Sequence, residues 1–147
     1  MRFLANLKCN HTRASFKEYA KILDANLSSN DDVTVFPPFS ALDLAAHKFK
    51  LGAQNFYPCE SGVHTGEIGK AMLDEFSVKS VLIGHSERRE LGESEELLRA
   101  KFDFAAKAGW QIVYCIGENL SVNEAGRTKE FLAEQLKNID QIGRAHV

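Results

Sequence analysis

The segment SVLIGHSERRE, residues 80–90, runs from an apolar stretch of strand length directly into a glycine, a histidine, a serine and four charged side chains. A short apolar run that ends at Gly84 is typical of a buried strand. In parallel α/β proteins, ligands bind beyond the carboxyl ends of the strands, so the residue that follows such a run is the one to inspect. His85 is therefore the first candidate functional residue.

The rest of the chain repeats this strand pattern between helical patterns. Further short apolar or β-branched segments occupy residues 2–7, 32–36, 51–55 and 111–116. Helical patterns lie between and after these strands. The first is an apolar stripe from Phe16 to Leu27, which begins at a capping box of Ser15 and Glu18. Shorter candidates occupy 40–49 and 69–76, another helix is capped by Ser94 and stopped by Gly109, and a last stripe consists of Leu132, Leu136 and Ile139. Five strand–helix units predict a parallel sheet covered by helices, either doubly wound or closed into a barrel.

The repeat length bears on this choice. About 30 residues per unit gives about 240 residues for eight units, close to the size of a (β/α)8 barrel. This chain then holds five units of eight.

Composition narrows the classes of function. The 147 residues carry a formal net charge of −2 with 44% hydrophobic residues, which is ordinary for one globular domain and gives no basic surface for nucleic acid. No apolar run reaches the roughly 18 residues of a membrane span, and no secretory signal is visible. Three cysteines without metal-ligand spacing predict reduced thiols in the cytoplasm and neither a disulfide framework nor a metal site. We expect a small-molecule partner, without nucleic acid or membrane.

A second group of polar residues ends the first predicted strand. Asn6 and Lys8 are two residues apart, and side chains at that spacing on a strand share a face. Lys8 is suited to hold an anionic substrate and Asn6 to orient the substrate or the lysine, while His85 can polarise a carbonyl or move protons. The alternatives are a solvated lysine, a histidine that only satisfies its turn, and a solvated charged turn at residues 87–90.

Five segments in order along the chain together resemble the triosephosphate isomerase family, in its bacterial form. They are ANLKCN at 5–10, AQN at 53–55, TGEIG at 65–69, IGHSERRELGES at 83–94 and CIGE at 115–118. The resemblance implies a (β/α)8 barrel that interconverts dihydroxyacetone phosphate and glyceraldehyde 3-phosphate in glycolysis and gluconeogenesis. It implies no metal and no organic cofactor, and a homodimer for the full-length protein.

The resemblance also assigns roles. Asn6 and Lys8 match the family's substrate-binding pair, with Lys8 also catalytic, and His85 matches its electrophile. This family is the usual worked example of a histidine kept neutral beside a helix amino terminus, so that imidazole polarises the carbonyl. Glu87 matches a position that interacts with the lysine and histidine region, in a chemical or a structural role.

The long segment 56–68 matches a loop that enters a pocket of the second subunit. The resemblance places Thr65 at its tip and lets Glu67 pair with Arg88 across the dimer interface. The alternative is a floppy surface loop.

This sequence departs from the family pattern in two ways. Its first motif has Ala5, Leu7 and Cys9 where the family reads more like GNWKMN, which concerns packing more than chemistry. The family's catalytic glutamate lies after the sixth strand and its glycine-rich phosphate loops after the seventh and eighth, so we expect these parts to lie beyond this chain.

We therefore expect residues 1–141 to form a partial (β/α)8 barrel domain with strands 2–7 and 111–116 as unpaired edges. Residues 142–147, IGRAHV, neither continue the last helical stripe nor resemble the family, and they are the translation of a common sequencing-adapter sequence. We expect them to be a non-native tail. Rival interpretations are another phosphate-handling barrel enzyme and an inactive truncated fragment or non-catalytic interaction module.

Overall fold

The computed structural model of the chain describes residues 1–43, 47–137 and 139, so the expected tail at 142–147 lies outside the described residues. Parallel strands alternate with helices along the chain. The elements are β1 (Arg2–Asn6), α1 (Arg13–Asn26), β2 (Asp32–Phe36), the 3-10 helix η1 (Phe39–Ala41), β3 (Lys50–Leu51), α2 (Lys70–Glu75), β4 (Ser80–Ile83), α3 (Ser86–Glu90), α4 (Glu95–Lys107), β5 (Gln111–Tyr114), α5 (Leu120–Glu124) and α6 (Thr128–Leu136).

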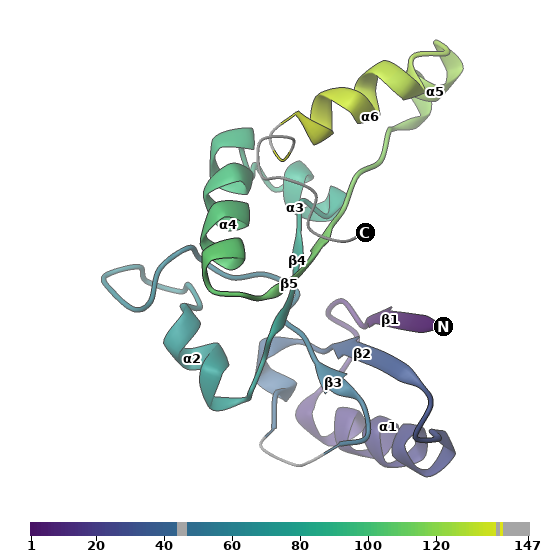
Figure 1. Cartoon of the computed structure of the whole chain (residues 1–147), viewed down its shortest axis with the longest axis vertical. Helices are drawn as coiled ribbons and strands as arrows, with labels where there is room; N and C mark the ends of the chain where they lie inside the picture. The colour runs from purple at the N-terminus through teal and green to yellow at the C-terminus, as the bar shows by residue number, and fades with distance from the viewer. Residues whose placement is uncertain (44–46, 138, 140–147) are drawn as a thin grey trace.

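The strands pair in the order in which they occur in the sequence. One parallel sheet has the order β1-β2-β3 and a second consists of β4 and β5. A parallel bridge between Ala53 and Val81 joins them, with α1 against the first sheet and α4 beside the second (Figure 1). A doubly wound sheet reverses its strand order at a switch point, whereas successive neighbours 1-2-3-4-5 form the wall of a barrel. The structure thus favours the barrel over the doubly wound sheet.

The strand expected at 51–55 is only two residues long because it changes partner. Lys50 and Leu51 pair with β2, whereas Ala53 pairs with β4. At Gly52, between them, a Cβ would lie 2.3 Å from Cε1 of the buried Phe36 ring, so only glycine lets the ring pack there. The hydrogen bonding therefore switches from one sheet to the other within three residues.

The two long amphipathic helices form where their apolar stripes predict. In α1, Phe16 and Ala20 are buried. Its amino cap, however, is Thr12, with Ser15 closing the capping box, so the expected box of Ser15 and Glu18 is wrong by one turn. In α4 the expected cap Ser94 accepts a hydrogen bond from Leu97 N.

The short helices were less predictable. The helix expected at 40–49 is wrong in its described part, where η1 ends at Ala41 and β3 begins at Lys50; residues 44–46 lie outside the described residues. The charged turn expected after His85 is the helix α3, whose cap is His85 itself. α5 was not expected, and the last stripe lies in or just after α6.

The core consists of two apolar clusters, one for each sheet. The cluster of the first sheet includes the buried residues Phe16, Val33 and Val35. The cluster of the second sheet includes Phe56, Val81 and Leu98. Within the described part of the chain β1 and β5 each pair with one strand, as the expected edges do, and Phe3 on β1 is half exposed. No helix among the described residues is long and apolar enough to cross a membrane.

Candidate active site

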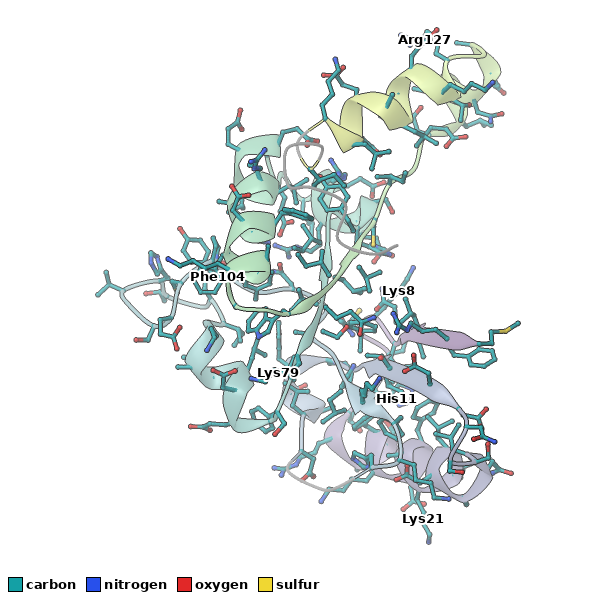
Figure 2. All side chains as sticks on the ribbon, viewed as in Figure 1. Lys8, His11, Lys21, Lys79, Phe104 and Arg127 are labelled. Carbon is teal, nitrogen blue, oxygen red and sulfur yellow. The ribbon has the colours of Figure 1, made fainter. Side chains whose placement is uncertain are left out.

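The predicted site residues meet at one cavity. A pocket of about 180 Å³ lies at the carboxyl ends of the strands and is lined by residues that include Asn6, Lys8, Gln54, His85, Glu87 and Arg88. Lys8 follows β1 of the three-stranded sheet, His85 follows β4, and Glu87 lies on α3. Figure 2 shows Lys8 above β1, on the side of its sheet that faces α3. The pocket thus combines side chains from both sheets.

Lys8 has an unusual backbone. Its φ of 52° places it in the left-handed region, which few residues other than glycine adopt. Asn6 Oδ1 accepts a hydrogen bond from Lys8 N at 3.0 Å, and Gln54 Nε2 donates to Lys8 O and to Phe36 O, each at 2.8 Å. Asn6 and Lys8 line one pocket, as expected, but strand spacing is not the reason, because β1 ends at Asn6 and the chain turns at Lys8. Asn6 orients the lysine through its backbone instead.

Glu87 connects Lys8 with His85. Lys8 Nζ donates to Glu87 Oε1 at 2.7 Å, and Glu87 Oε2 lies 3.5 Å from His85 Nδ1. This hydrogen bond and charge raise the pKa of Lys8 and hold the pKa of Glu87 below its usual range. Both groups are about half exposed, so the pair adds little stability. It orients the ammonium group toward α3.

The contacts of His85 favour one tautomer. The backbone N–H of Glu87 donates to His85 Nδ1 at 3.3 Å, and that N–H cannot change its role. The competing atom, Glu87 Oε2, lies 3.5 Å from Nδ1, which is longer than a good hydrogen bond. A neutral ring with an unprotonated Nδ1 carries its proton on Nε2. His85 can therefore act as a hydrogen-bond donor without being charged.

A larger cavity lies elsewhere. It has about 690 Å³ and is lined by residues at the opposite ends of the strands, among them Lys50, Ser80 and Gln111. Its lining includes none of the predicted site residues. Side chains at the amino-terminal face of a parallel barrel usually serve stability. We therefore assign the site to the smaller pocket.

Comparison with known proteins agrees with this geometry. The family model described as triosephosphate isomerase matches residues 1–146. The chain belongs to the triosephosphate isomerase family. It is 81% identical over 141 residues to the triosephosphate isomerase of Campylobacter curvus, 60% identical to that of Campylobacter jejuni subsp. jejuni and 49% identical to that of a Sulfurovum species. These alignments cover 95% of this chain but only 62 to 64% of the relatives. The family and its bacterial form, inferred from the motifs, are confirmed.

The loop that the family resemblance assigns to the dimer is well ordered at its neck. Tyr57 N donates to Ile68 O, and Lys70 N donates to Cys59 O. Residues around Thr65 are exposed, and the loop before α2 projects from the body of the protein (Figure 1). Backbone hydrogen bonds therefore anchor the loop at its two ends.

The two charged residues expected to pair across the dimer lie on the loop and on α3 of one chain. Glu67 is exposed on the loop, and Arg88 pairs with Glu93 of its own chain, at 2.7 Å from Nη2. The pairing between subunits stays a prediction.

Sequence reasoning missed a buried polar network behind the site. Lys101 on α4 is 2% exposed, and its ammonium donates to Asn55 Oδ1 at 2.6 Å and pairs with Glu93. Burial lowers the pKa of Lys101, and the carboxylate of Glu93 opposes this shift. The sequence does indicate that Lys101 is buried, because it lies three residues after Leu98 on the apolar face of the helix.

Gln54 was also missed. It was noted only as part of the AQN motif, although it is a polar residue at the end of a predicted strand, which is the position that drew attention to His85. Within the described part of the chain, no group of three or more histidine, cysteine, aspartate or glutamate side chains is placed to hold a metal ion.

Proposed function

We propose that this chain supplies the electrophile and the substrate-binding lysine of a triosephosphate isomerase, which interconverts dihydroxyacetone phosphate and glyceraldehyde 3-phosphate. The observation that carries the proposal is the meeting of Lys8 and His85, joined by Glu87, at one pocket. The chain spans about 62% of the length of its Campylobacter relative, so the activity of the whole protein is inferred from this part of the site and from the family.

The two side chains suit the two demands of the reaction. When a base removes a proton from the carbon next to the carbonyl, negative charge develops on the carbonyl oxygen. A neutral His85 with its proton on Nε2 can donate a hydrogen bond to that oxygen, and the ammonium group of Lys8 stabilises the charge and holds the phosphate. Glu87 is engaged by Lys8, so we assign the base to the glutamate that the family carries after its sixth strand.

The setting of the protein is part of the proposal. We place it in the cytoplasm, where free thiols such as Cys9, Cys59 and Cys115 stay reduced. We also propose that the full-length protein is a homodimer whose loop 56–68 enters the partner. No further macromolecular partner is proposed, because the weak net negative charge favours neither nucleic acid nor anionic membranes.

The test uses a fused chain, in which residues 1–141 of this protein are followed by the part of the Campylobacter curvus relative that lies beyond the aligned region. We expect the fused chain to isomerise triose phosphates. His85→Gln is expected to lower kcat about 100- to 1,000-fold and to leave substrate binding nearly unchanged, because the donor acts on charge that develops in the transition state. Lys8→Met is expected to weaken substrate binding as well.

The comparison with the 147-residue chain alone separates enzyme from interaction module. We expect the shorter chain, purified away from host isomerase, to show no turnover. Unchanged turnover of His85→Gln in the fused chain would falsify the electrophile role, and a fused chain that folds but does not turn over would favour the non-catalytic alternative.

A further inference from the structure

Arg89 makes three contacts beneath the catalytic histidine. Its side chain is 16% exposed, and Nε donates to Gly84 O at 2.7 Å. Nη1 pairs with Glu95 in the first turn of α4, and Nη2 donates to the Tyr114 hydroxyl of β5 at 3.4 Å. The guanidinium carbon lies 5.8 Å from the Tyr114 ring centroid. One side chain therefore ties the end of β4 to two neighbouring elements.

The backbone before His85 is shaped to receive this contact. Gly84 has a φ of 76°, which favours glycine, and a Cβ there would lie 2.8 Å from Arg89 Nη2 and 3.1 Å from Cys115 O. The guanidinium and the turn are thus packed directly against each other. A side chain at residue 84 would displace the arginine.

Both peptide carbonyls around His85 are bound by the same residue. Arg89 Nε donates to Gly84 O, and Arg89 N donates to His85 O at 3.1 Å, shared with Arg88 N. These bonds restrain the two peptide units that flank His85. The bond from Glu87 N to Nδ1 then holds the ring.

We propose that Arg89 is the positioning residue of the electrophile: it sets the backbone at Gly84 and His85 so that Nε2 of His85 meets the substrate oxygen. The proposal rests on the proposed function and deepens it. Arg89 acts through His85 and does not touch substrate. Active-site groups must be held to within about 0.5 Å, and a displacement of about 1 Å can cost about 100-fold in rate.

These three contacts require a guanidinium group and not only a positive charge. A planar guanidinium presents Nε, Nη1 and Nη2 in three fixed directions, toward Gly84, Glu95 and Tyr114. A lysine ammonium keeps the charge but has no group at the position of Nε. The charge and the positioning contact can therefore be separated by substitution.

The experiment compares Arg89→Met and Arg89→Lys in the fused chain. We expect both to lower kcat by about 10- to 100-fold, with KM for glyceraldehyde 3-phosphate within about twofold of the parent, because the substrate-binding Lys8 is untouched. Glu95→Gln is the matched control, since it removes the ion pair and leaves the Gly84 contact. It is expected to lower the melting temperature but to keep kcat within about threefold of the parent.

A readout that does not depend on activity accompanies the kinetics. ¹⁵N NMR of the His85 ring, assigned by its loss in His85→Gln, is expected to show Nδ1 unprotonated in the parent and in Glu95→Gln, and a mixture of tautomers in Arg89→Met. If Arg89→Lys matches the parent in kcat, or if Glu95→Gln loses as much rate as Arg89→Met, the positioning role is wrong. If the parent fused chain is inactive while the ring responds as expected, the proposed function fails and the positioning role stands.

Discussion

Lys8 combines the side chain proposed to bind substrate with a strained backbone. A non-glycine residue in a sparsely populated conformation costs about 1–3 kcal/mol and persists only where its surroundings hold it. Here the amide of Lys8 is held by Asn6 and its carbonyl by Gln54. The strain turns the lysine away from the strand direction and toward Glu87, so it serves the site.

Gln54 is therefore expected to matter although it lies behind the lysine. Gln54→Met keeps the size of the side chain but removes the donor to Lys8 O and Phe36 O. Because each lost hydrogen bond costs about 1 kcal/mol, we expect the affinity of the fused chain for substrate to fall about tenfold, measured by titration calorimetry with an unreactive substrate analogue.

Gln111→Met, at the opposite ends of the strands, is the control and is expected to bind as the parent does. Equal affinity in the two variants would show that Lys8 holds its conformation without Gln54.

For single residues, the sequence predicted which side chains line the pocket better than it predicted the contacts between them. Residue type and position after a strand were enough to single out His85 and Lys8. Side-chain periodicity failed at Lys8 because that argument assumes a continuing strand, whereas β1 ends at Asn6 and the following turn depends on Gln54, 46 residues away. No local pattern encodes that contact.

At the scale of elements, α4 is held by a buried charge. Lys101 and Glu93 are both at least 95% buried, and Glu93 also pairs with Arg88. The network connects the segment after β3, through Asn55, to α3 and α4. Removing one partner of a buried pair leaves the other uncompensated, which is more costly than replacing both.

Lys101→Met is accordingly expected to destabilise the fused chain by about 3 kcal/mol, at the lower end of the usual range because Arg88 still pairs with Glu93. The double variant with Glu93→Leu is expected to recover most of that loss. Urea unfolding measures both. Lys107→Met, on an exposed position of the same helix, should change stability by less than about 0.5 kcal/mol. A loss below 1 kcal/mol in Lys101→Met would contradict the role assigned to the network.

The elements were predictable where their signal is long. α1 and α4 have apolar stripes of several turns, and the structure contains both. α3 and α5 have five residues each, too few for a periodic pattern, and form because His85 and Asn119 cap them. The segment after Gly52 was expected to continue as a strand, but sequence alone does not show a strand exchanging partners.

For the whole molecule, the loop 56–68 is the feature that one chain does not explain. It is pinned at its neck, yet Val63 at its tip is fully exposed. A loop that is anchored at its neck and has an exposed apolar tip is suited to burial in a second copy.

We expect the fused chain to sediment as a dimer at micromolar concentration, and Val63→Asp or Thr65→Asp to shift it to monomer, because a charge at the tip would be desolvated in the partner's pocket. Leu120→Asp, an exposed apolar position on α5, is the control and should remain dimeric. Sedimentation velocity distinguishes these outcomes. A parent that sediments as a monomer, or tip variants that remain dimers, would overturn the proposed homodimer.

The exchange of partners at Gly52 and Ala53 also bears on the order of folding. Lys8 and Glu87 are 79 residues apart in the chain and follow strands of separate sheets, so we expect their ion pair to form only after each sheet has assembled and the two have docked. Contacts that close such long loops are slow. A pair of fluorescent labels beside these residues would therefore report docking rather than local folding, and we expect the pocket to form late in the folding reaction.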